Sequence, residues 1–510
     1  MFGKCLAGGI QGVLAYVVRV ETDISDGLPS NCLVGFLGNE VKEAHERVWT
    51  AIKNAGFTIP PKKITINLAP ANIRKHGTGY DLPMAVSLLA AMEVVESEKL
   101  EETVFCGELS LSGEIGAVRG VLPIVKLAKD NGIKRCIIPK ANAKEGAVIE
   151  GVEIMAVENL KQLISFLREE ISITPESNIS DDLFDYNYIE NDMEDVQGQQ
   201  VAKRGIEIAA AGLHNVLMIG PPGTGKTMLS KCVAGILPPL TKEECLEVSS
   251  VYSVAGLLNE NKGLITNRPF ISPHHSVTDI ALTGGGMTPR PGLISLAHRG
   301  VLFLDEMPEF TKNTLEVLRQ PLEDKVIHIS RSTYMCDYPA DFMLVGALNP
   351  CPCGMYPDMQ KCHCSEKARK QYIGRLSRPL IDRMDICMQV NRPDSKSIIY
   401  KKKGESSVDV RKRVIRAQEI QRERFENKSD RNLSKILFNS QMNNDDIEKY
   451  CELSKNSLKV VEKAIDKYDL SARAYHRILK TARTIADLEG EEKIREENIV
   501  EALFYRVDLM

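Results

Sequence analysis

Eight consecutive residues have the types and spacing that bind a phosphate chain: Gly220, Pro221, Pro222, Gly223, Thr224, Gly225, Lys226 and Thr227. Glycines let the backbone N–H groups of such a loop approach phosphate closely, the lysine reaches the β- and γ-phosphates, and the last hydroxyl binds Mg²⁺. Residues 215–219, which are apolar after Asn215, predict a buried strand before this phosphate loop, and residues 228–234 predict a helix after it. The alternative, a glycine-rich turn that binds nothing, is disfavoured by this context.

Two downstream segments end in polar residues that suit the same chemistry. Residues 301–304 form a continuous apolar run, typical of a strand buried on both faces, and Asp305 and Glu306 follow it. In phosphate-loop enzymes an aspartate at this place holds Mg²⁺, and the next carboxylate can polarise the attacking water. A third apolar run, 342–348, delivers Asn349 to the same edge, where its amide would orient the water or contact the γ-phosphate; a simple strand-end turn is the alternative. Together these segments predict Mg²⁺-dependent ATP hydrolysis, with ATP and Mg²⁺ as cofactors.

Four cysteines stand in two close pairs just after Asn349: Cys351, Cys353, Cys362 and Cys364, here called the cysteine cluster. Four thiolates at this spacing can close a tetrahedral Zn²⁺ site, with His363 as an extra candidate ligand. Because C-x-C is less typical of zinc ribbons than C-x₂-C, four reduced thiols are the alternative. The other cysteines are mostly scattered singly through apolar runs, which is typical of the reducing cytoplasm, and we expect the protein there.

The chain of 510 residues is long enough for about three domains. Residues 1–168 alternate strand-like and helix-like patterns, and residues 169–194 form an acidic linker rich in Ser, Asn, Asp and Glu. The ATPase core spans 195–392, and a basic stretch then leads into a helical segment, 393–510. The predicted fold is therefore α/β: a P-loop core with a parallel sheet and a helical C-terminal lid, preceded by an α+β domain.

Composition excludes some classes of protein and leaves others open. Hydrophobic residues make up 43% and charged residues 26%, which is ordinary for a globular protein. The net charge of −4 gives no sign of a nucleic-acid binder, so any such surface must be local. No apolar stretch reaches membrane-spanning length and the N-terminus lacks a signal-peptide pattern, so we expect no membrane association.

Many short blocks outside these motifs match one family pattern. In the core and the helical segment they are SPHHS (272–276), GGG (284–286), PRPG (289–292), AHRG (297–300), VLFLDEMPEF (301–310), NPCPCG (349–354), RLSRPLIDRMD (375–385) and SARAYHRILKTARTIADL (471–488). In the N-terminal third they are GLP (27–29), NLAP (67–70) and YDLP (80–83). On these blocks the chain resembles the YifB/ComM family of magnesium-chelatase-like AAA+ ATPases nearly end to end.

This resemblance implies a homo-hexameric ring whose ATP sites lie between subunits. An arginine of one subunit must then reach the γ-phosphate bound by its neighbour, where it stabilises charge that develops during transfer. The position that matches the family motif is Arg383, and Arg375 and Arg378 are the alternatives.

The resemblance also implies a second nucleotide-contacting arginine, Arg473, at the start of the helical block 471–488. Arg477, Lys480 and Arg483 follow at three- and four-residue spacing, so they share one face of that helix with Arg473. For these three residues we expect a solvated basic face and no nucleotide contact.

The N-terminal third resembles the Lon-protease-like domain that precedes the ATPase core in this family. Lon-type proteolysis needs a serine nucleophile and a lysine base. When residues 74–81 are laid against the Lon serine motif, Thr78 is the nearest hydroxyl, and Leu122 stands where the base should be. The domain is therefore predicted to be proteolytically inactive, with a protein partner as its expected ligand.

A glycine-rich insertion and a nearby alternating segment are candidates for a pore surface. His274 and His275 are not expected to bind metal, because adjacent side chains point apart on a strand and no carboxylate or cysteine stands at a useful spacing. They fit a loop that faces the ring pore, where three glycines and Arg290 would suit a phosphate backbone. Residues 325–338 alternate like strands and predict a hairpin that projects Arg331 into the same channel; an ordinary edge hairpin is an equal alternative.

The leading interpretation is an ATP-driven ring motor that translocates on DNA, as ComM-like members do when they drive branch migration in recombination and natural transformation. Contacts to phosphates would make binding independent of sequence and sensitive to salt. One alternative is a chelatase-type subunit that remodels a protein partner, although such subunits lack the Lon-like domain. Another is a non-motor switch in which ATP sets assembly and the N-terminal domain recruits partners.

Overall fold

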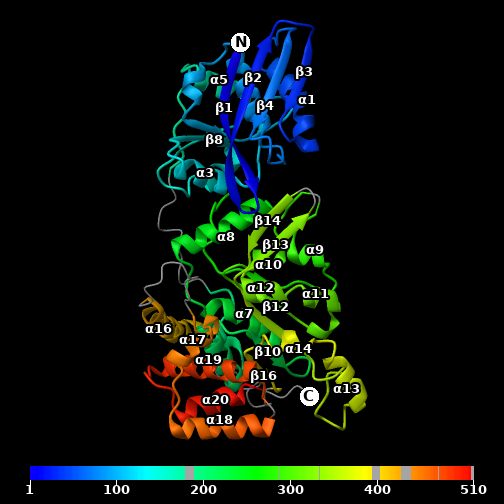
Figure 1. The fold of residues 1–510 in the computed structure, drawn as a ribbon, viewed down its shortest axis with the longest axis vertical. Coiled ribbons are helices and arrows are strands. Elements are labelled where there is room, and N and C mark those ends of the chain that lie inside the picture. The colour runs from blue at the N-terminus through cyan, green and yellow to red at the C-terminus, as the bar shows by residue number, and fades with distance from the viewer. Residues whose placement is uncertain are drawn as a thin grey trace.

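The computed structural model describes residues 1–177, 189–286, 288–331, 334–392, 403–426, 438–468 and 470–506. Figure 1 shows three bodies along the longest axis: an N-terminal domain, a central α/β module and a set of C-terminal helices. Part of the predicted linker, residues 178–188, and residues 393–402 at the start of the predicted lid lie outside the described part of the chain.

The N-terminal domain is built on a mixed seven-stranded sheet in the order β3-β4-β2-β1-β5-β8-β9. Its strands are β1 (Phe2–Gln11), β2 (Leu14–Ser25), β3 (Ser30–Val34), β4 (Lys63–Ala69), β5 (Thr103–Phe105), β8 (Arg135–Pro139) and β9 (Glu153–Val157), and a separate small pair joins β6 (Glu108–Leu109) to β7 (Ile115–Gly116). Its helices are α1 (Asn39–Asn54), α2 (Asp81–Ala91), α3 (Val121–Asp130), α4 (Ala143–Gly146) and α5 (Leu160–Leu167). Every residue of α2 is buried, so this helix is the centre of the domain's core.

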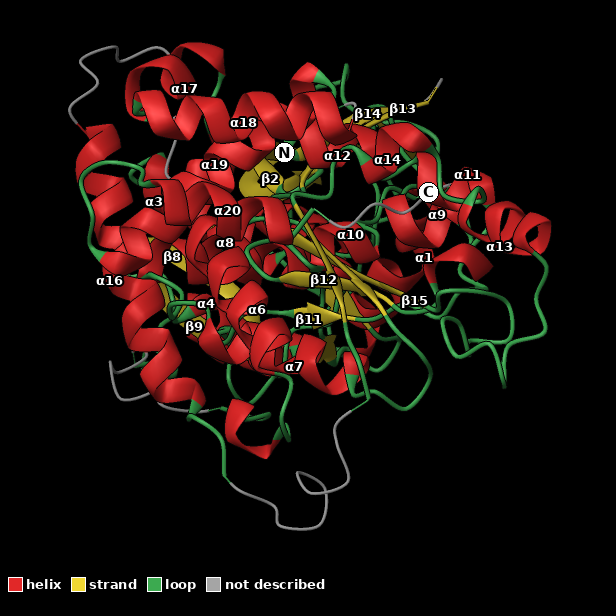
Figure 2. Cartoon of the chain, turned by 90° about the horizontal axis from the view of Figure 1, so that it is seen from below, coloured by secondary structure: helices red, strands yellow, loops and turns green. Residues whose placement is uncertain are grey.

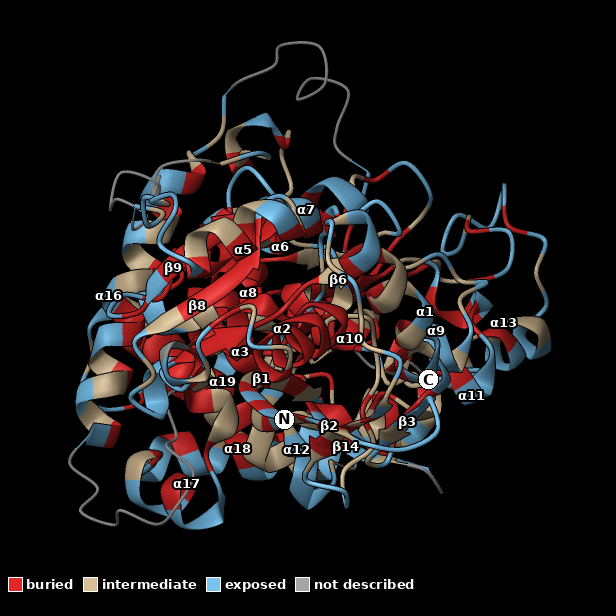
Figure 3. Ribbon diagram, turned by 90° about the horizontal axis from the view of Figure 1, so that it is seen from above, coloured by how far each residue is buried: buried red, intermediate tan, exposed pale blue. Residues whose placement is uncertain are grey.

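The central module contains a five-stranded parallel sheet in the order β11-β12-β15-β10-β16. The strands are β10 (Val216–Ile219), β11 (Phe270–Ile271), β12 (Val301–Leu304), β15 (Met343–Leu348) and β16 (Ile386–Gln389). Every residue of β10, β12 and β15 is buried, which explains their continuous apolar sequences. Figure 3 shows inner elements of the N-terminal domain such as α2 and β8 as mostly buried, whereas peripheral helices such as α13 (Glu366–Ile373) carry many exposed residues.

The helices of the central module lie on both faces and at the rim of this sheet (Figure 2). They are α6 (Gln200–Gly212), α7 (Lys226–Ile236), α8 (Lys242–Ala255), α9 (Asp279–Thr283), α10 (Leu293–Leu296), α11 (Lys312–Glu316), α12 (Arg319–Asp324), α13 and α14 (Arg378–Ile381). A separate antiparallel hairpin joins β13 (Val326–Arg331) to β14 (Tyr334–Pro339), and within the described residues it pairs with no strand of the main sheet.

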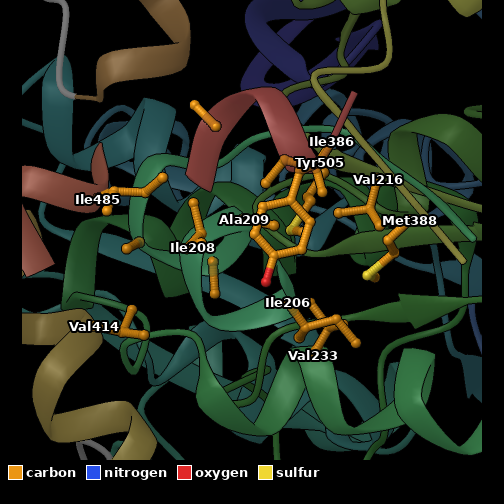
Figure 4. Packing of buried hydrophobic residues seen from close by; sticks show 14 of the residues in the cluster. Ile206, Ile208, Ala209, Val216, Val233, Ile386, Met388, Val414, Ile485 and Tyr505 are labelled. Carbon is orange, nitrogen blue, oxygen red and sulfur yellow. The ribbon is translucent and has the colours of Figure 1, made fainter. Parts of the chain in front are cut away.

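The C-terminal helices share one core with the sheet. They are α16 (Ser407–Glu426), α17 (Asn444–Tyr450), α18 (Lys455–Tyr468), α19 (Ala472–Glu489) and α20 (Glu496–Phe504). Figure 4 shows Val414, Ile485 and Tyr505 from these segments gathered around Ile206 of α6 and Val216 of β10. This continuous packing fixes the helices against the face that α6 covers. None of the helices in the described ranges is long and apolar enough to cross a membrane.

The N-terminal domain contacts the central module at two places. Helix α3 packs on α8, where the Ser253 hydroxyl lies 2.5 Å from the buried Glu145 carboxylate and the Gly120 N–H donates to the Ser253 carbonyl at 3.1 Å. The tip of the β1–β2 hairpin reaches β14, and the Gln11 amide donates to the Met335 carbonyl at 3.0 Å (Figure 1). The domain is therefore fastened to both α8 and the β13–β14 hairpin.

Candidate nucleotide site

The phosphate loop joins the carboxyl end of β10 to the amino end of α7. Gly223 and Gly225 have φ values of 77° and 89°, a conformation that favours glycine, and no neighbouring atom lies within 4 Å of where a Cβ would stand. Gly220 is needed for a different reason, because a Cβ there would lie 2.2 Å from the Val390 carbonyl oxygen. The loop is thus tight against the sheet at its start and open above its two later glycines, where a phosphate chain would fit.

Lys226, the first residue of α7, is only 7% exposed. Its ammonium donates to the Gly220 carbonyl at 2.6 Å, to the Pro221 carbonyl at 2.9 Å and to the Asn349 amide oxygen at 3.3 Å. Burial lowers the pKa of Lys226, although the neighbouring carboxylates act in the opposite direction. Asn349 therefore lies beside the phosphate loop, as its place after β15 predicted.

Thr227, Asp305 and Glu306 converge next to Lys226. The Thr227 hydroxyl donates to the Asp305 carboxylate at 2.9 Å, and the second oxygen of that carboxylate accepts the Glu306 N–H at 2.9 Å. A hydroxyl beside a carboxylate is the oxygen donor set that Mg²⁺ uses in nucleotide sites, so these residues fit the ion. Glu306 is exposed and has a φ of 50°, a left-handed conformation that costs about 1–3 kcal/mol in a non-glycine residue and is typical of functional sites.

A residue that the sequence motifs did not reveal, Gln199, ties the loop to the sheet. Its amide donates to the Thr224 carbonyl at 3.1 Å and also to the Asn391 carbonyl just beyond β16, while the Thr224 hydroxyl donates back to the Pro221 carbonyl at 3.0 Å. Gln199 has a φ of 58° and directly precedes α6. The only sequence signal for it is the preceding Gly198, which marks a turn before the helix.

Arg383 lies at the amino ends of the parallel strands, opposite the phosphate loop at their carboxyl ends. Strands β16 and β10 pair in parallel, with Ile386 opposite Val216. The phosphate loop begins at the other end of β10. At about 3.3 Å per residue along that strand, the chain just before Ile386 therefore lies about 16 Å from the phosphate loop. The Arg383 guanidinium donates to the Pro379 carbonyl at 2.7 Å and pairs with Glu323, and its side chain is 12% exposed. It is therefore too far away to serve the nucleotide site of its own chain.

The two alternative arginines are placed differently. Arg375 donates to the Pro308 carbonyl and to the Glu309 carboxylate, both at 3.1 Å, in the turn that follows Glu306. Arg378 is exposed at the start of α14. Of the three candidates, Arg375 is engaged next to its own chain's site, and Arg383 lies at the far edge of the sheet.

The expectation that Arg477, Lys480 and Arg483 of α19 form a solvated basic face is wrong. Arg477 pairs with Asp385 at 3.3 Å, Lys480 donates to the Ser440 carbonyl at 3.0 Å, and Arg483 is only 2% exposed and pairs with Asp487 at 3.0 Å. The stripe packs inward because buried carboxylates supply its counter-charges. Arg473 alone of the four is exposed, one turn before Arg477.

Asp385 joins the helix that carries Arg473 to the loop that carries Arg383. Besides pairing with Arg477, it accepts the Asn215 N–H at 3.1 Å and lies 3.6 Å from the His214 ring. Burial would raise the pKa of Asp385, but the nearby His214 ring and the charge of Arg477 outweigh burial and hold that pKa well below its usual range. Arg383 and Arg473 are thus anchored at one edge of the sheet, opposite the phosphate loop.

The four Sγ atoms of the cysteine cluster all lie within 4.8 Å of one another. Cys353 is exposed, and the backbone N–H of Met355 is the main cause that lowers its pKa to about 7. His363 is not part of the group, and in the described part of the chain no other set of His, Cys, Asp and Glu side chains comes together in this way. His274 instead bonds its neighbour Ser276 at 2.8 Å.

The glycine-rich insertion and the β13–β14 hairpin interlock. The Tyr334 hydroxyl donates to the Gly286 carbonyl at 2.7 Å, and the Gly285 N–H donates to the Arg290 carbonyl at 2.9 Å. Arg290 and Arg331 are both exposed on this paired structure. The predicted hairpin is confirmed.

In the N-terminal domain, the residues that align with the Lon nucleophile and base form no catalytic pair. The Thr78 hydroxyl donates to the Glu108 carboxylate at 2.5 Å. Leu122 is fully buried in the core of the domain. Leu122 has no basic group that could activate the Thr78 hydroxyl, and the absence of proteolysis stays a prediction.

Comparisons with known proteins cover almost the whole chain. Family models described as "Subunit ChlI of Mg-chelatase", "Magnesium chelatase, subunit ChlI" and "Magnesium chelatase, subunit ChlI C-terminal" match residues 20–142, 192–398 and 404–506. Competence protein ComM of Haemophilus influenzae is 42% identical over 97% of this chain and 95% of its own length, and YifB of Escherichia coli is 41% identical over the same shares. Lon protease 2 of Bacillus subtilis is 31% identical over 26% of this chain and 23% of its own length. The chain, with a Lon-like N-terminal part and an AAA+ module, belongs to the ComM/YifB family of magnesium-chelatase-like AAA+ ATPases.

Proposed function

We propose that this protein is an ATP-hydrolysing ring motor that acts on DNA, a branch-migration helicase of recombination and natural transformation. The ring is supported by the positions of the site residues, which lie in two groups at opposite ends of the sheet's strands. Lys226 and Glu306 lie at one edge of the sheet, and Arg383 and Arg473 lie at the other. A single chain leaves such a site incomplete, and six copies in a ring complete it.

In this mechanism each residue has one task. Lys226 binds the β- and γ-phosphates, Thr227 and Asp305 hold Mg²⁺, and the ion neutralises phosphate charge when bound. Glu306 polarises the attacking water, and Asn349, already bonded to Lys226, orients it. Arg383 of a neighbouring copy leaves Glu323 and offsets the charge that develops on the γ-phosphate, with Arg473 of that copy as the second contact.

The DNA assignment is supported by Arg290 and Arg331. Both are exposed on the interlocked insertion and hairpin, in a chain whose net charge of −4 offers no general attraction for DNA. One full-length relative is named a competence protein, which favours a nucleic-acid role over a metal-insertion role. We place the protein in the cytoplasm, with its N-terminal domain available to a protein partner.

DNA affinity is expected to rise with ATP and to fall steeply with salt, because ring assembly creates the channel and phosphate contacts release counterions. Arg290→Ala and Arg331→Ala should each lower the slope of log affinity against log salt by about 1 and leave sequence preference unchanged. Fluorescence anisotropy with labelled DNA of two unrelated sequences, across a salt series, measures both quantities. Arg495→Ala, which removes an exposed arginine of the C-terminal helices, is the matched control and should keep the parental slope.

The main alternative is a chelatase-type ATPase that remodels a protein. The family model over residues 20–142 carries the name of a chelatase subunit, so the N-terminal domain alone does not separate the two functions. DNA binding that is indifferent to both ATP and salt would contradict the DNA motor and favour protein remodelling. A non-motor switch predicts that ATP controls assembly but that neither DNA nor a protein partner stimulates hydrolysis.

A further inference from the structure

The cysteine cluster has the geometry of a tetrahedral metal site. A Zn–S bond of about 2.3 Å places the sulfurs of a tetrahedral site about 3.8 Å apart. Here the Cys351 sulfur lies 3.4 Å from that of Cys353 and 3.7 Å from that of Cys362, and the last two are 3.7 Å apart. These separations are far longer than a disulfide bond, about 2.05 Å, so the sulfurs converge without being joined.

Backbone groups support the sulfurs as they do around metal-bound thiolates. The Met355 N–H donates to the sulfur of Cys353, and the Cys364 N–H donates to that of Cys362. In each pair the donor lies two residues after the cysteine that accepts. Such hydrogen bonds orient the ligands of a metal and stabilise their charged form.

The loop that holds the cluster is also a wall of the phosphate site. Cys351 follows Asn349 by two residues, and the Gly354 N–H donates to the Cys351 carbonyl at 2.9 Å. Gly354 has a φ of 76°, and a Cβ on it would lie 2.7 Å from Pro222 and 3.8 Å from the Asn349 side chain. The backbone directly after the first cysteine pair therefore packs on the phosphate loop.

We propose that the cysteine cluster binds one zinc ion, and that this zinc holds Gly354 against Pro222 and so fixes Asn349 beside Lys226. The zinc is structural, because all four ligands come from the protein and none of the coordination positions is open to substrate. Nucleotide affinity then depends on the metal, although the metal never contacts nucleotide. The proposal rests on the nucleotide site of the proposed function and not on its DNA-binding activity.

The test measures zinc content and ATP affinity in the same samples. Protein purified without chelator should contain about one zinc per chain by mass spectrometry of the metal. The double variant Cys353→Ser, Cys364→Ser should contain none, and it should bind a fluorescent ATP analogue about tenfold more weakly, as expected when a hydrogen bond to the Lys226 ammonium is lost. Cys32→Ser, which removes an exposed cysteine of the N-terminal domain, is the control and should match the parent in both measurements.

A second measurement covers the case in which the double variant does not fold. Zinc is displaced from the parent with a mercurial reagent, which is then removed with excess thiol, and ATP affinity is measured before and after zinc is restored. Affinity that falls with the metal and returns with it supports the proposal. Parent protein that contains no zinc would contradict the metal site. Zinc removal that leaves ATP affinity unchanged would contradict the proposal that the zinc supports the phosphate loop. Neither outcome depends on whether DNA is the substrate of the motor.

Discussion

Glu306→Gln is expected to stop ATP turnover and to leave nucleotide binding almost unchanged. The amide keeps the shape of the side chain but cannot accept a proton from water, and a general base contributes about 10²–10⁴-fold to such reactions. Glu306 is exposed and contacts the phosphate site through its backbone bond to Asp305, so the substitution removes charge without disturbing a buried contact. Steady-state hydrolysis and equilibrium binding of a fluorescent ATP analogue, measured on the same preparation, separate the two effects.

Two further variants are needed to interpret this result, one that should lose binding and one that serves as a matched control. Lys226→Ala should abolish binding itself, because the buried Lys226 ammonium, which lies within the phosphate loop, is proposed to contact the phosphates. Glu309→Gln makes the same chemical change three residues away, on an exposed carboxylate paired with Arg375, and should hydrolyse ATP at close to the parental rate. Parental turnover by Glu306→Gln would show that another group activates the water.

Arg383→Ala is expected to bind ATP normally and to hydrolyse it about 10³–10⁵-fold more slowly, as when an arginine finger is removed. This loss is expected because Arg383 lies at the opposite end of the strands from the phosphate loop and is proposed to serve the site of the next subunit. Equal mixing of Arg383→Ala and Lys226→Ala chains should restore part of the activity. In the mixed ring, a Lys226→Ala subunit supplies its intact Arg383 to the intact phosphate loop of its neighbour.

The matched control is a mixture of Lys226→Ala and Glu306→Gln chains. Both defects then lie on the nucleotide-binding side of the interface, so no mixed site is complete and activity should stay absent. Arg375→Ala and Arg378→Ala, mixed in the same way, test the two alternatives. If Arg383→Ala is not rescued although subunit exchange is demonstrated by fluorescence, the shared site is wrong.

The nucleotide-binding half of the site could be predicted because parallel sheets impose a simple pattern. A strand buried on both faces needs an apolar run, and the carboxyl ends of neighbouring parallel strands meet at one edge. The residues that follow 216–219, 301–304 and 343–348 therefore had to come together, and the bonds of Lys226 to Asn349 and of Thr227 to Asp305 follow from that topology.

The remaining features depend on tertiary contacts that no local pattern encodes. Helical spacing showed that Arg477 and Arg483 share a face, but only the packed structure shows that Asp385 and Asp487 meet that face from other segments. Gln199 contacts the phosphate loop through a left-handed backbone conformation that has no sequence motif. The contact of Gly354 with Pro222 joins two loops far apart in the sequence.

The rate of ATP hydrolysis as a function of DNA concentration tests the central claim most directly. The proposed motor predicts a rate that rises with DNA and saturates, with half-saturation moving to higher DNA concentration as salt is raised. Glu306→Gln should show no rise, which assigns the activity to this chain. A rate that stays at its basal value with single-stranded, duplex and branched DNA at low salt, in protein shown to bind ATP and form rings, would contradict the account.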